Sequence, residues 1–247
     1  MNDYLSIKNI YKRYEQSDKG QLVLENINLS IEKNEFVAIL GPSGCGKTTL
    51  LKIIAGFLEA EKGAIFKNGV RLTGASPDRI MVFQEFRQLF PWKTVLGNVV
   101  FALKAKKIGE TTTEREKIAR DYLKKVGLVD AIGHYPYQLS GGMKQRVALA
   151  RTFAADPEIM LMDEPFGSLD SQTRNSLQNL LLDIWQEDQK TILFVTHDIS
   201  EAIILADRIV VMGANPGRLI KVVNNDLTRP RNRMSSEFTQ LYKAISK

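Results

Sequence analysis

A chain of 247 residues, 44% of them hydrophobic, can bury a sizeable core, which excludes an intrinsically disordered protein. No run approaches the roughly 18 apolar residues of a membrane span, and no basic stretch followed by an apolar one opens the chain. We therefore expect neither a membrane anchor nor a secretory signal. The single cysteine, Cys45, excludes an internal disulfide and is consistent with a reducing compartment; we assign it no redox role.

The net charge of +6 is concentrated near the C-terminus. Residues 218–247 contain seven basic and two acidic side chains, so +5 of the charge lies there and the remainder is almost neutral. This distribution does not indicate the basic stripe across a domain face that is typical of nucleic-acid binding. We expect the tail to be a solvated surface, with attraction to anionic lipid headgroups as the alternative.

The first third of the chain is predicted to form strands. Residues 4–10 and 22–31 alternate apolar and polar side chains on either side of a polar turn at residues 16–20. An apolar run of strand length, Phe36–Leu40, then leads directly into a glycine-rich segment.

That segment, Gly41–Thr48, fits the pattern G-x-x-x-x-G-K-[ST]. Its glycines allow a tight turn in which several N–H groups point at one anion, Lys47 adds a positive charge, and the Thr48 hydroxyl can bind Mg²⁺. A helix beginning near Thr48 presents its positive end to the same phosphates. The alternative, a glycine-rich turn with a solvated lysine, is weakened by the preceding strand. The predicted nucleotide contacts are Gly41, Pro42, Ser43, Gly44, Cys45, Gly46, Lys47, Thr48 and Thr49.

Between about residues 86 and 155 the periodicity becomes helical, which predicts an inserted helical subdomain. One helix is expected to begin at Thr113, with Glu116 completing a capping box, and to end at Gly127. Strands and helices then alternate, which implies a parallel sheet covered on both faces. The strands expected in this part are residues 159–162, 191–195 and 209–212.

Two carboxylates, Asp163 and Glu164, come directly after the apolar strand 159–162. A carboxylate at the end of a buried strand beside a phosphate-binding loop can hold Mg²⁺ through its water shell. Glu164 is then placed to accept a proton from a water that attacks the terminal phosphorus. Taken alone, an Asp-Glu pair after a strand more often belongs to a surface turn. Together with the phosphate-binding loop, it favours a role in metal binding and catalysis instead.

A second anion site is predicted where Ser140, Gly141 and Gly142 precede a helix from about Met143 to Ala155. Backbone N–H groups and the helix dipole point outward from such a start. One nucleotide does not obviously require two sites of this kind.

At this point the chain resembles the ATP-binding-cassette (ABC) family of transport ATPases, from about Tyr4 to the C-terminus. The resemblance is carried, in the family's order, by Gly41–Thr48, Gln84 after a strand, Leu139–Met143, Asp163-Glu164, Ser168-Leu169-Asp170 and Thr196-His197-Asp198.

The resemblance implies the α/β fold of a P-loop NTPase. We expect a mostly parallel core sheet, an N-terminal antiparallel β subdomain and an inserted α-helical subdomain within one ABC ATPase domain. The expected parts are residues 1–85 and 156–225 for the RecA-like core with the β subdomain, 86–155 for the helical subdomain and 226–247 for the basic tail.

The resemblance also implies ATP and Mg²⁺ as cofactors and a head-to-tail homodimer. Each ATP would lie between Gly41–Thr48 of one subunit and Ser140, Gly141 and Gly142 of the other. A lone subunit should then hydrolyse ATP poorly.

Individual roles follow from the same resemblance. His197 would hydrogen-bond the γ-phosphate, and Gln84 would reach the metal or the attacking water, so that Glu164, His197 and Gln84 are the expected catalytic residues. Tyr14 resembles the aromatic residue that stacks on adenine, with Tyr11 as the alternative. The implied metal ligands are Thr48, Gln84 and Asp163. Met143 stands where the family commonly has glutamine, and a thioether cannot donate a hydrogen bond.

The apolar segment Leu89–Trp92 either packs within the helical subdomain or forms an exposed patch for a partner's helix. Segments 211–218 and 227–231 are similar to the ATPases of nitrate, sulfonate and taurine importers. The resemblance therefore implies separate integral-membrane permease subunits, indirectly a solute-binding protein, and a peripheral position on the cytoplasmic side of the plasma membrane. The competing interpretation is a soluble ABC-type ATPase that clamps nucleic acid, although no nucleic-acid partner is expected.

Overall fold

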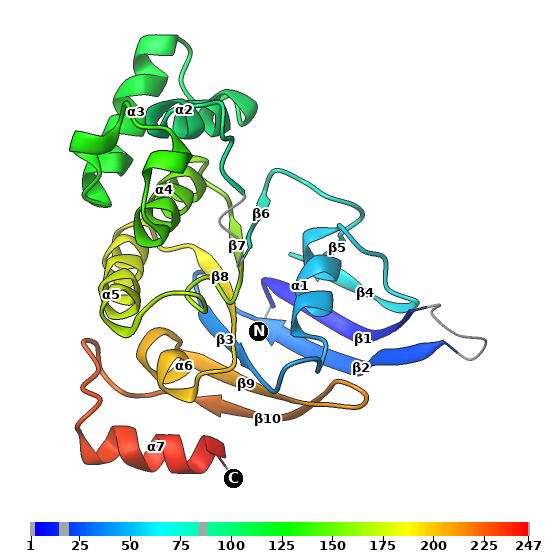
Figure 1. Ribbon diagram of the computed structural model, residues 1–247. Helices are drawn as coiled ribbons and strands as arrows, with labels where there is room; N and C mark the ends of the chain where they lie inside the picture. Colours follow the sequence, from blue (N-terminus) through cyan, green and yellow to red (C-terminus); the bar gives the residue numbers. More distant parts are fainter. Residues whose placement is uncertain (1–2, 15–19, 84–87, 247) are drawn as a thin grey trace.

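The computed structural model describes residues 3–14, 20–83 and 88–246. Two sheets and seven α-helices make up this part of the chain (Figure 1). Gln84 and most of the predicted turn at residues 16–20 lie outside the described residues.

The core sheet has six strands in the order β10-β9-β3-β8-β7-β6. Neighbouring strands from β9 to β6 run parallel, while β10 pairs with β9 in the antiparallel direction. β7 and β8 are buried along their whole length, as expected for parallel strands covered on both faces. The strands are β3 (Phe36–Leu40), β6 (Arg79–Val82), β7 (Ile159–Asp163), β8 (Thr191–Thr196), β9 (Arg208–Gly213) and β10 (Arg218–Asn224).

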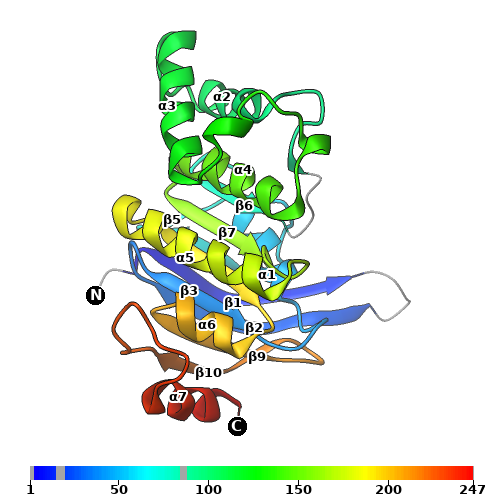
Figure 2. The same ribbon diagram turned by 60° about the vertical axis from the view of Figure 1, so that its left-hand side comes forward.

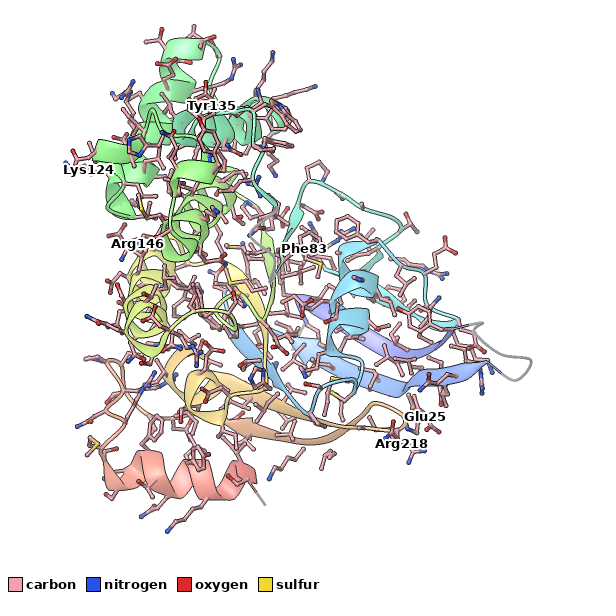
Figure 3. The ribbon with its side chains drawn as sticks, in the orientation of Figure 1. Glu25, Phe83, Lys124, Tyr135, Arg146 and Arg218 are labelled. Carbon is pink, nitrogen blue, oxygen red and sulfur yellow. The ribbon has the colours of Figure 1, made fainter. Side chains whose placement is uncertain are left out.

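A four-stranded antiparallel sheet, in the order β2-β1-β4-β5, forms the N-terminal subdomain. β1 continues to Tyr14, beyond its predicted end at Ile10, because it pairs with β2 as far as Gln21. An ion pair between Glu25 on β2 and Arg218 on β10 joins the two sheets (Figure 3). The strands are β1 (Leu5–Tyr14), β2 (Gln21–Ile31), β4 (Lys62–Lys67) and β5 (Val70–Arg71).

Alternate side chains of the core sheet face two different hydrophobic cores. In β3, Phe36, Ala38 and Leu40 join the core that contains the inner faces of α4, α5 and α6, whereas Val37 and Ile39 join the core shared by α1 and the antiparallel sheet. α1 and α4 therefore lie on opposite faces of the core sheet, as both ribbon views show (Figures 1 and 2). The helices concerned are α1 (Lys47–Ala55), α4 (Gly141–Ala154), α5 (Ser171–Asp188) and α6 (Ile199–Leu205). The expected fold class is confirmed.

The helical subdomain projects from the edge of the core sheet near β6 and β7 (Figure 1). Its helices are α2 (Val95–Ala105), α3 (Thr112–Lys125) and α4, with 3₁₀ turns η2 (Val129–Ala131) and η3 (Pro136–Gln138). The predicted capping box of α3 is wrong by two residues. Thr111 and Glu114, not Thr113 and Glu116, cap the helix. Both pairs have the same spacing, but the Glu114 carboxylate accepts bonds from the N–H groups of Glu110 and Thr111, which fixes the earlier start.

The C-terminal segment is built into the fold, so the expectation of a solvated tail is wrong for two of its arginines. The Arg231 side chain is 1% exposed and donates to the carbonyls of Ile203 and Ala206 at the end of α6. Arg229 pairs with Asp207 and donates to the Leu205 carbonyl. Guanidinium groups satisfy the carbonyls that a helix leaves open at its C-terminus. Burial lowers the pKa of Arg231 to about 10, so it stays charged at neutral pH.

A further helix, α7 (Ser236–Ser246), follows these arginines and is not among the elements predicted from the sequence. Phe238 and Ile245 are buried in the same core as α6, and Leu241 packs against it. Their spacing of three and four residues is the signal that predicts such a helix. No helix in the described part of the chain is both long and apolar enough to cross a bilayer.

Candidate functional site

Three parallel strands of the core sheet end at the same edge, and a predicted site segment follows each of them. Leu40, the last residue of β3, pairs with Thr196 at the end of β8, and Asp163 at the end of β7 pairs with Val195. Because the carboxyl ends of parallel strands meet at one edge, the loop Gly41–Thr48, the Asp163-Glu164 pair and His197 come together.

The loop between β3 and α1 depends on glycine at two positions. A Cβ atom on Gly41 would lie 2.7 Å from the Met212 carbonyl oxygen and 2.8 Å from the Cys45 sulfur. Gly46, the N-cap of α1, has a φ of 97°, and no side chain accepts a bond from the first turn of the helix. The first N–H groups of α1 are thus open to an anion.

Lys47 lies at the mouth of this loop with only 5% of its side chain exposed. Its ammonium donates to the carbonyls of Gly41 (2.7 Å) and Pro42 (2.9 Å) and lies 3.9 Å from a carboxylate oxygen of Glu164. An ammonium has three donors, so one remains for a phosphate oxygen.

Thr48 and Asp163 present oxygen atoms to one another. The Thr48 hydroxyl donates to Asp163 Oδ1 at 2.9 Å. Burial raises the pKa of Asp163, while this hydrogen bond opposes the shift. Hard oxygen ligands of this kind suit Mg²⁺, which keeps several waters and shares phosphate oxygens. Among the described residues no group of three or more His, Cys, Asp and Glu side chains could hold a metal.

Glu164 and His197 are in direct contact. Glu164 has a φ of 43°, unusual for a residue with a side chain, and its N–H donates to the Val195 carbonyl at 3.0 Å. His197 Nδ1 lies 2.9 Å from Glu164 Oε2. An ionised carboxylate only accepts, so Nδ1 carries the proton of this bond. The His197 side chain is 57% exposed and can reach a ligand.

The predicted second anion site lies at the start of helix α4. Ser140 is its N-cap, and the Ser140 hydroxyl accepts from the Met143 N–H at 3.3 Å. A Cβ atom on Gly142 would lie 2.6 Å from the Thr173 methyl group, so this position has no room for a side chain. Because α1 and α4 are on opposite faces of the core sheet, one chain does not bring Ser140 to the loop Gly41–Thr48.

Tyr14 lies next to the start of α1. Its hydroxyl is 3.3 Å from the Thr49 hydroxyl, and the Lys12 ammonium lies 5.8 Å from the centre of its ring. Tyr11, the alternative, instead has the Lys62 ammonium 5.9 Å from its ring centre. The position of Tyr14 is thus the one beside the predicted nucleotide contacts.

A phosphate-binding loop between a strand and a helix, with an acidic residue at the end of a parallel strand in the same sheet, defines a P-loop nucleotide-binding protein. Comparison with known proteins gives the family. The ABC transporter family model matches residues 24–167, which is more than half of the chain. The chain therefore belongs to the ABC transporter family, and the resemblance found in the sequence is confirmed.

Relatives and solved structures agree with this assignment. An uncharacterised ABC transporter ATP-binding protein of Methanocaldococcus jannaschii is 52% identical over 98% of this chain and 89% of the relative. The aliphatic sulfonates import ATP-binding protein SsuB of Bacillus thuringiensis subsp. konkukian is 46% identical over 96% of this chain and 92% of the relative. A dimeric post-hydrolysis structure of an ATP-binding cassette with ADP and Pi has a TM-score of 0.79 and 35% identity, covering 91% of this chain and 100% of that one. The chain is an ABC ATPase.

Proposed function

We propose that two copies of this chain close head to tail around two ATP molecules and drive an importer. Each ATP would lie between Gly41–Thr48 of one copy and Ser140–Gly142 of the other. The observation that carries the proposal is the position of the two helix starts: α1 and α4 each present an anion site, on opposite faces of one sheet. The similar cassette structure that contains ADP and Pi is also dimeric.

Within each pocket the residues would have separate roles. The N–H groups of α1 and Lys47 bind the phosphates. Thr48 and Asp163, with Gln84, would hold Mg²⁺, which neutralises charge on the phosphates when bound. Glu164 accepts the proton of the attacking water. Tyr14 would stack on the adenine.

His197 would change partner during this cycle. Its bond to Glu164 uses the Nδ1 proton and occupies one oxygen of the carboxylate that would accept a proton from water. We infer that the γ-phosphate draws the imidazole away, so that His197 donates to phosphate and Glu164 is released for the water. The contact between Glu164 and His197 is then the resting arrangement of the site.

The membrane partner would dock on an apolar groove between the core sheet and the helical subdomain. Phe83 lies at the end of β6 (Figure 3) and lines a cavity of about 380 Å³ together with Phe90 and Phe101. Trp92, beside Phe90, is 70% exposed. Leu89 is buried, so the segment Leu89–Trp92 both packs into the subdomain and exposes an aromatic side chain. We propose that a short cytoplasmic helix of a separate permease occupies this groove.

The transported solute would be a sulfonate-type anion or a small organic solute, delivered by a solute-binding protein. The relative named for aliphatic sulfonates supports this class. The chain would then lie peripherally on the cytoplasmic side of the plasma membrane. Nucleic-acid clamping is not favoured, because Arg229 and Arg231 contact Asp207 and backbone carbonyls instead of facing outward.

The test uses the chain reconstituted with the permease encoded beside it. Trp92→Ala should abolish solute-stimulated ATP hydrolysis and leave the basal rate unchanged, since Trp92 lies outside the ATP site. Tyr242→Ala removes an exposed aromatic side chain on α7 and serves as the matched control. Full solute stimulation of the Trp92→Ala complex contradicts docking in this groove.

A further inference from the structure

A chain of hydrogen bonds leads from the C-terminal segment to the residue before His197. Arg233 Nη2 donates to Gln178 Oε1 on α5 at 2.7 Å, and Gln178 Nε2 donates to Glu201 Oε1 on α6 at 2.9 Å. The Glu201 side chain also lies beside Thr196 at the end of β8, since both line one small cavity. Three segments that are far apart in the sequence thus meet beside the residues that flank His197.

The middle of this chain is deeply buried. Glu201 is 5% exposed and Gln178 is 1% exposed. Burial raises the pKa of Glu201, and its polar neighbours Thr196 and Gln178 oppose that shift. A buried charge rarely stabilises a fold more than an apolar side chain of similar size does. Packing α6 against α5 therefore does not explain a carboxylate at position 201.

Glu201 borders the segment that carries His197. The Thr196 hydroxyl oxygen accepts the Asp198 N–H at 3.0 Å. Asp198 in turn accepts the N–H of Glu201 itself at 3.2 Å. Both chain neighbours of His197 are thus hydrogen-bonded, and the Glu201 side chain lines one small cavity with Thr196, His197 and Glu164.

Arg233 and Glu201 together hold the Gln178 amide. A guanidinium only donates, so the Gln178 oxygen faces Arg233 and its nitrogen faces Glu201. Without Arg233 the Gln178 oxygen loses this donor, and only the bond to Glu201 still holds the amide in place.

We propose that Glu201 is a positioning residue for His197, and that Gln178 and Arg233 transmit the placement of the C-terminal segment to it. The proposal rests on the proposed role of His197 in hydrolysis. The loop Gly41–Thr48 follows a different strand and keeps its own contacts with the phosphates. Loosening the connection therefore lowers turnover more than it lowers the affinity for ATP.

The test measures kcat, KM and melting temperature of the full-length chain. Glu201→Gln replaces the carboxylate that accepts the Gln178 N–H by a neutral amide and should lower kcat about tenfold, with KM unchanged within about twofold. The exchange Gln178→Glu with Glu201→Gln restores a carboxylate and an amide side by side. It should therefore recover most of kcat, which a loss of stability alone would not predict.

Arg233→Ala keeps the proposal testable if variants of the buried pair fail to fold, because Arg233 is exposed. It should lower kcat about threefold. Lys243→Ala, which removes an exposed charge from α7, is the control and should leave kcat unchanged. Wild-type kcat in Arg233→Ala, or in folded Glu201→Gln, would overturn the proposal. His197→Ala separates the two claims. Full activity of this variant would overturn the role of His197 itself. Loss of activity in His197→Ala, together with wild-type kcat in Glu201→Gln and Arg233→Ala, would overturn only the connection.

Discussion

The two helices that begin at an anion site, α1 and α4, begin in opposite ways. α1 starts at Gly46, where no side chain caps the helix, and Lys47 and Thr48 lie in its first turn. α4 starts at Ser140, whose hydroxyl already accepts the Met143 N–H, so that hydroxyl has only its proton left to offer. We therefore expect the start of α1 to bind a phosphate by itself, and the start of α4 only to add a few donors to a phosphate held elsewhere.

The opposite positions of the two helices explain why the chain has both sites. α1 packs in the core beneath the antiparallel sheet, and α4 packs with α5 and the helical subdomain on the other face. In the proposed dimer, a second copy turned head to tail would bring the start of α4 to the phosphate bound at the start of α1. Substitutions at each helix start, and at Glu164, test this difference between the two sites.

The largest effect is expected for Glu164→Gln. An amide cannot take the proton of the attacking water, so turnover should fall about 10³-fold while ATP binding persists. The measurement is steady-state ATP hydrolysis beside ATP binding by calorimetry. Glu116→Gln, which changes an exposed carboxylate on α3, is the control. Turnover within tenfold of wild type would remove Glu164 from its assigned role.

Lys47→Ala tests the predicted phosphate site at the start of α1. Loss of one charge-assisted hydrogen bond to phosphate should weaken ATP binding about 10- to 100-fold. Titration with a fluorescent ATP analogue measures the affinity, with Lys33→Ala, an exposed charge removed elsewhere, for comparison. An unchanged dissociation constant would mean that α1 does not bind the nucleotide.

Ser140→Ala tests the predicted site at the start of α4, and Thr111→Ala, which removes the N-cap of α3, is the matched control. Ser140 and Thr111 each accept an N–H three residues ahead, so either change to alanine should cost about 1 kcal/mol of stability. Only Ser140→Ala should also lower turnover, about tenfold, with ATP affinity unchanged. Equal turnover in the two variants, measured beside urea unfolding, would show that Ser140 is a helix cap and nothing more.

Met143→Gln should have the smallest effect. The Met143 side chain is partly buried against the hydrophobic core, and its N–H is already held by Ser140. We expect turnover to change by less than about threefold, because the donors of this site are the Ser140 hydroxyl and backbone groups. A tenfold gain in turnover would show that a side-chain donor at position 143 matters.

Most of the core could be predicted from the sequence for a specific physical reason. Strands such as β7 and β8 are buried on both faces and read as mostly apolar runs, and the loop Gly41–Thr48 needs glycine at positions 41 and 46, where a Cβ atom would come too close to its neighbours. The predicted capping box of α3 lies two residues too late, because Thr111 and Thr113 each have a glutamate three positions on. Spacing alone cannot choose between them.

The C-terminal segment shows where prediction from sequence stops. The bonds of Arg231 go to backbone carbonyls of α6, about 25 residues earlier, and any residue type supplies a carbonyl. The chain of Arg233, Gln178 and Glu201 likewise joins three segments that no local pattern relates. The assigned roles of Tyr14, Glu164 and His197 remain predictions, and Gln84 lies outside the described residues.

The shared pocket can be tested most directly by cross-linking between two chains. In a Cys45→Ser, Glu164→Gln background, one chain carries Ser43→Cys and the other Lys144→Cys, so that Ser140 is left intact. Head-to-tail closure predicts that a short bifunctional maleimide joins the two different chains only when ATP is present, while either chain alone gives little product. ATP bound at full affinity with no cross-link between the two chains would contradict the account.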